Sequence, residues 1–103
     1  MSTFQYSGIY AKVVDTSLTT LITAPAGYVY SCKNINVANV TDSTISASLY
    51  YNGTYALISG VSIEPNTCFI ITDPVAVLAA ETLDIVASAS GLHVIIYLQK
   101  FTQ

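Results

Sequence analysis

The stretch Thr44-Ile45-Ser46-Ala47-Ser48-Leu49-Tyr50-Tyr51-Asn52-Gly53 decides the fold class. Its side chains alternate over residues 44–51, and one face of the segment would hold Ile45, Ala47, Leu49 and Tyr51. A period of two residues is the pattern of a half-buried β-strand. The following Asn52-Gly53 is a strong hairpin signal, because a type I′ turn needs positive φ at both central residues. These residues therefore predict a strand that turns back on itself.

The turn also predicts which side chains of the hairpin lie opposite one another. With a two-residue loop, Tyr51 would pair with Thr54 and Tyr50 would pair with Tyr55. In that register Tyr50, Tyr55 and Leu57 lie on the outer face of the hairpin. Such a face is more apolar than a monomer requires, so it predicts a contact surface.

The same β signal extends along the rest of the chain. Thr, Val, Ile, Tyr and Phe dominate, and turn residues recur at short intervals, which is typical of a sandwich or barrel. The expected strands are 4–14, 18–24, 28–40, 44–51, 54–58, 61–64, 68–72, 75–78, 82–88 and 92–101. We therefore expect an all-β, single-domain antiparallel β-sandwich over residues 1–103, jelly-roll-like, with about 8–10 short strands. Residues 1–14 would be an edge strand or an arm on a neighbour.

The segment Leu92-His93-Val94-Ile95-Ile96-Tyr97-Leu98 is apolar on both of its predicted faces. Strands of this kind are covered on both sides, and a neighbouring subunit is a natural cover in a chain without helices. Aromatic residues also recur near the N-terminus. The predicted protein interface therefore consists of Phe4, Tyr6, Tyr10, Tyr50, Tyr55, Leu57, Ile95, Tyr97 and Phe101.

Composition excludes several classes of protein. Only 9% of the 103 residues are charged, against roughly 25% in an ordinary soluble domain. Mean hydropathy is +0.57, which argues against disorder. Three lysines, no arginine and six acids give a net charge of −3, so a nucleic-acid binder is not expected.

Membrane insertion and secretion are not expected either. The longest apolar run, Val75–Ala80, is far shorter than the roughly 20 residues of a spanning helix. The first residues have neither a basic nor an apolar segment of a secretory signal. We therefore expect the chain to fold in the cytoplasm where it is made, with Cys32 and Cys68 as reduced thiols.

Residues with catalytic or metal-binding chemistry are few. The one histidine, His93, lies inside an apolar strand, and the separations of Cys32, Cys68 and His93 match no zinc pattern. Glu81 and Asp84 are expected to mark a turn and a solvated strand edge. The sequence therefore predicts no enzyme, no cofactor and no metal site.

The eight tyrosines are the enriched group, and three interpretations remain open for them. Tyrosine packs in half-buried sandwich positions, supplies rigid area to protein interfaces, and stacks against sugars. A carbohydrate-binding module with Tyr50 and Tyr55 as its platform is therefore an alternative to a protein interface.

Several segments resemble small β-sandwich virion proteins of tailed bacteriophages. Thr20-Leu21-Ile22-Thr23-Ala24-Pro25-Ala26-Gly27 is similar to a corner of that family, and Asn34-Ile35-Asn36-Val37-Ala38-Asn39 to the strand after it. Residues 49–55 are similar to the family hairpin. Residues 78–83 stand where the family often has a glycine-containing corner, and this chain has no glycine there. The resemblance covers roughly residues 18–98.

The resemblance implies a capsid decoration (cement) protein that stabilises the phage head by binding between capsomers. The implied partners are the major capsid protein or another virion protein. Copies of the chain itself are also implied partners, and a trimer is favoured over other homo-oligomers. It also implies a location on the capsid surface of the virion after synthesis in the host cytoplasm. A neck, tail or head-fibre component of similar fold is the alternative within the same resemblance.

Overall fold

The computed structural model describes residues 3–14 and 16–102, with side chains described for 16–102. These residues form nine β-strands and no helix. The strands are β1 (Thr3–Val14), β2 (Thr19–Thr23), β3 (Tyr28–Asn39), β4 (Ile45–Tyr51), β5 (Tyr55–Ile63), β6 (Thr67–Ile71), β7 (Val75–Val77), β8 (Thr82–Ala87) and β9 (Leu92–Thr102).

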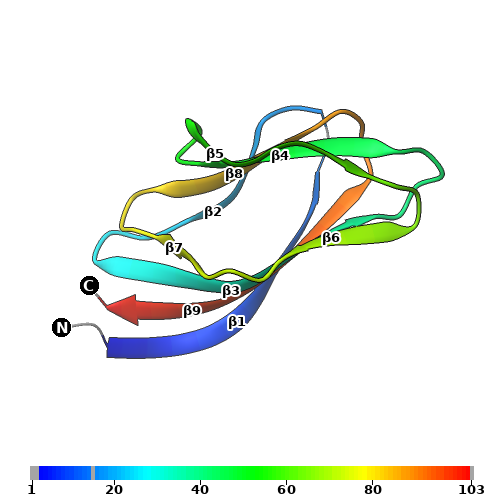
Figure 1. Cartoon of the computed structure of the whole chain (residues 1–103). Helices are drawn as coiled ribbons and strands as arrows, with labels where there is room; N and C mark the ends of the chain where they lie inside the picture. The colour runs from blue at the N-terminus through cyan, green and yellow to red at the C-terminus, as the bar shows by residue number, and fades with distance from the viewer. Residues whose placement is uncertain (1–2, 15, 103) are drawn as a thin grey trace.

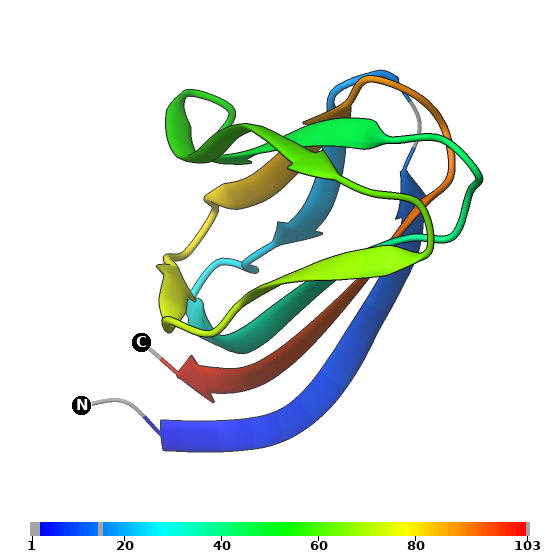
Figure 2. The same ribbon diagram turned by 45° about the vertical axis from the view of Figure 1, so that its right-hand side comes forward.

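The strands form two antiparallel sheets that pack face to face. Sheet A has the order β1-β9-β3-β6, and β7 pairs with the same strand β3 as β6 does. Sheet B has the order β2-β8-β4-β5. Figure 1 shows sheet B above sheet A, and the N- and C-termini leaving the sandwich at one end. Figure 2 shows the space between the layers that the side chains fill.

The pairing is nested around the β4–β5 hairpin. Outside that hairpin β3 pairs with β6 and β7, then β2 with β8, and finally β1 with β9. The chain therefore resembles a long two-stranded ribbon rolled up so that successive pairs lie in alternate sheets. Counting β6 and β7 as one interrupted strand, this is the eight-stranded double sheet of a jelly roll. The predicted fold class is confirmed.

The core comes from strict alternation in the central strands. Leu92, Val94 and Ile96 of β9 are fully buried, and they pack with residues of β3 such as Val37. Sheet B contributes buried residues such as Leu49 to the same cluster. Burial of a large aliphatic side chain is worth about 1.5–3 kcal/mol, so this alternation is the main source of stability.

Tight turns with positive φ angles join the sheets. In Pro25-Ala26-Gly27-Tyr28 the Tyr28 N–H donates to the Pro25 carbonyl over 3.1 Å, and Gly27 has φ +83°, as a type II turn requires. The turn that ends at Thr67 has Asn66 at φ +58° in the corresponding position. In the turn from Leu78 to Glu81 that position is held by Ala80, at φ +66°. The corner that lacks a glycine therefore keeps the glycine conformation.

Asn39 fastens the end of the sandwich that also holds the turn to Thr67. Its side-chain amide, in a residue 1% exposed, donates to the carbonyls of Ser43 (2.7 Å) and Ile63 (2.9 Å). Its Oδ1 accepts from the backbone N–H (3.0 Å) and the hydroxyl (2.7 Å) of Thr41. All four hydrogen-bonding positions of the amide are used, which links the end of β3 in sheet A to β5 in sheet B.

The predicted hairpin register is wrong. Tyr51 pairs with Tyr55, and Tyr50 pairs with Ala56. Asn52 and Gly53 do have positive φ, and the Thr54 N–H donates to the Tyr51 carbonyl over 3.2 Å, as in a type I′ turn. However, the loop contains one more residue, because Thr54 stays outside the ladder, and two further irregularities follow between Ala47 and Tyr50.

The strand assignments also decide two other predictions, on residues 54–64 and on the N-terminal segment. The predicted strands 54–58 and 61–64 are one strand, β5, which continues through Gly60. A bulge is accommodated there, because the Gly60 N–H donates to the Ser48 hydroxyl over 2.8 Å. The N-terminal segment is an edge strand of the chain's own sheet, since β1 pairs with β9 from Thr3 to Val14.

Ala80 provides a test of the corner before β8. A left-handed conformation is unfavourable for alanine by about 1–2 kcal/mol, whereas glycine adopts it freely. We predict that Ala80→Gly raises the free energy of unfolding by about 0.5–1 kcal/mol. The gain is smaller than the relieved strain, because glycine also has more conformational entropy in the unfolded chain. Urea denaturation measures the change. Ala79→Gly is the matched control, because Ala79 does not have positive φ, and it should lower stability; a gain in both variants would contradict the explanation.

Candidate functional site

The outer face of sheet A brings together three strands that are distant in the sequence. The pairings of β9, β3 and β6 place residues in rows across the sheet: His93–Ala38–Cys68, Ile95–Asn36–Ile70, and Tyr97–Asn34. Partners in antiparallel strands share a face, and the alternate residues of β9 are buried in the core. We call the eight residues of these rows the A face.

The A face is apolar and incompletely covered. Ile70 and Tyr97 are each 45% exposed, and Ile95 lies half-buried between them. In Figures 1 and 2 no strand of the described residues lies over the outer side of sheet A. The predicted interface residues Ile95 and Tyr97 therefore lie side by side on one surface, together with Ile70, which the sequence patterns did not single out.

A buried polar atom lies at the centre of the A face. The Oδ1 atom of Asn36, between Ile95 and Ile70, is buried and has no hydrogen-bond partner among the described residues. A buried acceptor without a donor is unfavourable by about 1–3 kcal/mol. Residues that lower stability in this way are concentrated at sites with a function, so Asn36 supports the A face as a candidate site.

Positively and negatively charged residues occupy different parts of the described structure. All three lysines and the histidine lie on strands of sheet A: Lys12, Lys33, Lys100 and His93. No strand of sheet A contains an acidic residue, and the acids of the described chain lie in loops or on β8. The Lys100 ammonium lies 4.2 Å from the centre of the Tyr28 ring, a cation–π contact. The register places Lys100 opposite Tyr30, which packs against the core, so this cation does not lie on the A face.

The outer face of sheet B has a different chemistry. Its exposed and half-buried positions are mostly hydroxyl-bearing: Thr20, Ser46, Ser48, Ser62 and Thr82. The expectation that Asp84 marks a solvated edge is wrong, because it is 4% exposed in the middle of this sheet. Its carboxylate accepts hydrogen bonds from Thr20 and Thr82, each 2.7 Å long, and these bonds allow its burial. Glu81 does lie in a turn.

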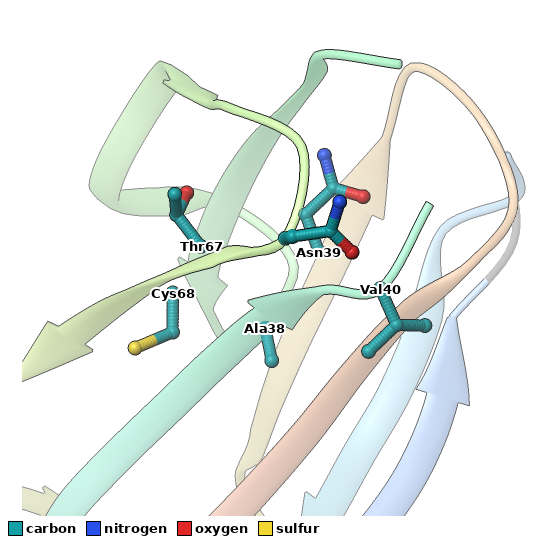
Figure 3. Close-up of a pocket in the computed structure, with 6 residues that line it drawn as sticks. Ala38, Asn39, Val40, Thr67 and Cys68 are labelled. Atoms are coloured by element: carbon teal, nitrogen blue, oxygen red, sulfur yellow. The ribbon is translucent and has the colours of Figure 1, made fainter. Parts of the chain in front are cut away.

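A shallow hollow opens at one end of the A face, where β3 ends and β6 begins. It has a volume of about 310 Å³ and is lined by Ala38, Asn39, Val40, Asn66, Thr67 and Cys68. Figure 3 shows Cys68 on β6 beside Ala38 on β3, with Val40 at the margin. The Asn39 amide is fully used inside the protein, so this hollow offers shape and apolar contact rather than a set of reactive groups.

The remaining predicted interface residues on sheet B do not join the A face as one site. Tyr55 (69% exposed) and Leu57 (42% exposed) project from β5 of sheet B, and Tyr50 is half-buried on β4. Phe101 is half-buried near the end of β9, at a position that alternates onto the same side of sheet A as Tyr97. The side chains of Phe4, Tyr6 and Tyr10 lie outside the described residues. Because Tyr50 faces Ala56 across the ladder, it is not paired with Tyr55 as a sugar platform would require.

The cysteines and carboxylates form no metal-binding group in the described part of the chain. Cys32 is buried in the core and Cys68 is exposed on the A face, both as free thiols. Tyr51 donates a hydrogen bond to Glu81, and burial together with this carboxylate raises the pKa of the Tyr51 hydroxyl. Residues 3–14 and 16–102 contain no helix long and apolar enough to span a membrane.

Comparison with known proteins identifies the fold but no family. No model of a known protein family matches the sequence, and no curated protein is similar to it. Solved virus structures share the fold. A chain from the acidic stable capsid structure of Helicobacter pylori bacteriophage KHP30 superposes with a TM-score of 0.64 at 8% identity, over 98% of this chain and 91% of that one. A chain from the structure of infectious bursal disease virus, Gx strain, gives a TM-score of 0.50 at 12% identity, over 99% of this chain and 33% of that one.

The unpartnered amide of Asn36 generates a stability prediction. We expect Asn36→Val to raise the free energy of unfolding by about 1 kcal/mol, because it removes a buried acceptor without a donor and favours the strand conformation. Thermal and urea unfolding measure it. Asn34→Val, two residues away on the same face, is the control and should give a smaller gain, since Asn34 has no such buried atom. Destabilisation by Asn36→Val would show that the amide is satisfied in solution.

The core thiol generates a prediction for alkaline pH. Burial raises the pKa of Cys32 from 9.0 to about 11, so the unfolded chain loses this proton at lower pH than the folded chain. This difference in pKa contributes about 3 kcal/mol to the loss of folding stability with pH. The free energy of unfolding keeps its full value below pH 9 and falls by this amount as the pH rises to about 11. We expect Cys32→Ala to reduce the loss of stability over this interval, measured by urea denaturation at each pH. Equal pH dependence of both proteins would contradict the assignment.

Proposed function

We propose that this chain is a structural virion protein of a tailed bacteriophage, most specifically a decoration (cement) protein of the capsid. The observation that carries the proposal is the KHP30 comparison, in which 98% of this chain corresponds to 91% of a chain from a capsid structure. Coverage of both chains means that the matched chains are of similar length. The match therefore extends over nearly all of that chain from a capsid structure.

The surface of the protein agrees with a role in assembly. The A face offers apolar and amide groups for contact, and the described residues contain no cluster suited to metal binding. We therefore propose a structural role and not a catalytic one. Each contact need only be modest, because many copies on a fixed lattice act together. The sequence resemblance favours trimers as the form in which the copies bind.

The proposal predicts that this chain stabilises phage heads. Particles assembled without it should release DNA at a lower temperature than complete particles, because contacts between capsomers are missing. Adding the purified protein should restore the release temperature. The measurement is the fluorescence of a DNA-binding dye during heating, and particles incubated with an unrelated protein of similar size are the control.

Copy number separates the head from other positions in the virion. Quantitative mass spectrometry of intact particles should give hundreds of copies if the protein covers the head. Equal release temperatures with and without the protein would overturn the cement role. A copy number in the tens would instead indicate a neck, tail or fibre position.

A further inference from the structure

The outer edge of β1 is a long row of backbone groups at the margin of sheet A. β1 pairs with β9 from Thr3 to Val14, and no other strand of the described chain pairs with it. Figures 1 and 2 show β1 along this margin with no strand beyond it. Alternate N–H and C=O groups of an edge strand point away from its neighbour, so this edge can accept a further strand.

The other edges of the sandwich are short or irregular. β2 has five residues and a register shift between Thr20 and Ile22. β5 has two register shifts in its pairing with β4, and Asp73 and Pro74 separate β6 from β7. Proteins protect sheet edges from further pairing by such features. β1 has 12 residues and, after one shift near its start, a continuous ladder over Tyr6–Val14. Among the described strands it therefore presents the longest regular free edge.

A second copy of this chain supplies a strand that matches this edge. Its β1 has the same length and is already part of a folded sheet, so no loose segment has to be ordered on binding. The one charged residue of β1 is Lys12, near the end of the strand. An antiparallel pair centred on Tyr10 places Lys12 opposite Gly8 and keeps the two lysines about 13 Å apart along the strands. A parallel pair in register would place the two lysines side by side, which is unfavourable.

We propose that β1 pairs with the β1 strand of a second copy, antiparallel and about a two-fold axis, so that sheet A continues from one copy into the other. The ladder over Tyr6–Val14 supplies about nine backbone hydrogen bonds, close to the roughly ten of a typical protein interface. The pairing is compatible with trimers, because a closed assembly can combine two-fold and three-fold axes. The inference goes beyond the proposed function and does not depend on it.

The symmetry of the pair gives a specific test by disulfide cross-linking. In an antiparallel pair about a two-fold axis one residue faces its own copy, and its neighbours along the strand lie further from theirs. Cysteines are therefore placed singly at residues 6–14, in a Cys68→Ser parent that retains only the buried Cys32. We expect rapid cross-linking at one position, where the two Cα atoms lie within about 7 Å, and cross-linking at least about tenfold slower at the others. Thr23→Cys, exposed on the edge strand β2, is the control and should react as slowly as those others.

Light scattering of the wild-type chain measures the pairing without any substitution. We expect an even number of copies at high concentration, because each copy uses its β1 edge once. A mass of one chain or of three chains would overturn the pairing, and so would cross-linking that is equally slow at every position of β1. Neither measurement uses phage particles, so failure here leaves the proposed function standing, and failure of the head-stability test leaves the pairing standing.

Hydrogen exchange reports directly on the edge of β1. Amides of β1 that point away from β9 face solvent in a single copy and are hydrogen-bonded in the pair. We expect these alternate amides to exchange at least about tenfold more slowly in concentrated protein than in protein diluted to single copies, while the amides bonded to β9 change little. Fast exchange of the outward amides in an assembly with an even number of copies would overturn β1 as the contact.

Discussion

Strand β9 is hydrogen-bonded along both edges, to β1 on one side and to β3 on the other, and the rest of the structure depends on this pairing. Because the backbone hydrogen bonds fill both edges of β9, its side chains alternate between the core and the outer side of the sheet. Leu92, Val94 and Ile96 fill the core, and the residues between them form the middle of the A face. A slip of one residue would exchange the two sets, so the same register fixes the stability and the candidate interface.

The fold class could be predicted because alternation is a local property of the chain. The segments 44–51 and 92–98 indicate strands without knowledge of their partners, and turn residues such as Gly27 mark where strands end. The hairpin register was not predictable in the same way. It depends on whether Thr54 joins the ladder, and β4 is also held by β8 on its other edge, which no local pattern around Asn52 reveals.

The candidate site was only half predictable for a similar reason. Ile95 and Tyr97 stand out because their strand is apolar on both faces, but Ile70 and Asn36 are ordinary residues in their own segments. They become part of a surface only when β3 lies between β9 and β6. Asp84 was misjudged because its burial depends on hydroxyl groups, one of which comes from Thr20, 64 positions away.

The nested pairing has a consequence for how the chain reaches its native state. The β4–β5 hairpin closes over a few residues, whereas the outermost pair joins Thr3 to Thr102. Loop-closure entropy therefore favours nucleation at the hairpin and zippering outward through the successive pairs. During synthesis β1 leaves the ribosome before the other strands, yet it cannot pair until β9 has emerged, since β9 separates it from β3. Strand β1 therefore stays unpaired until β9 has been synthesised. During this period its free edges make the chain most prone to aggregation and to chaperone binding.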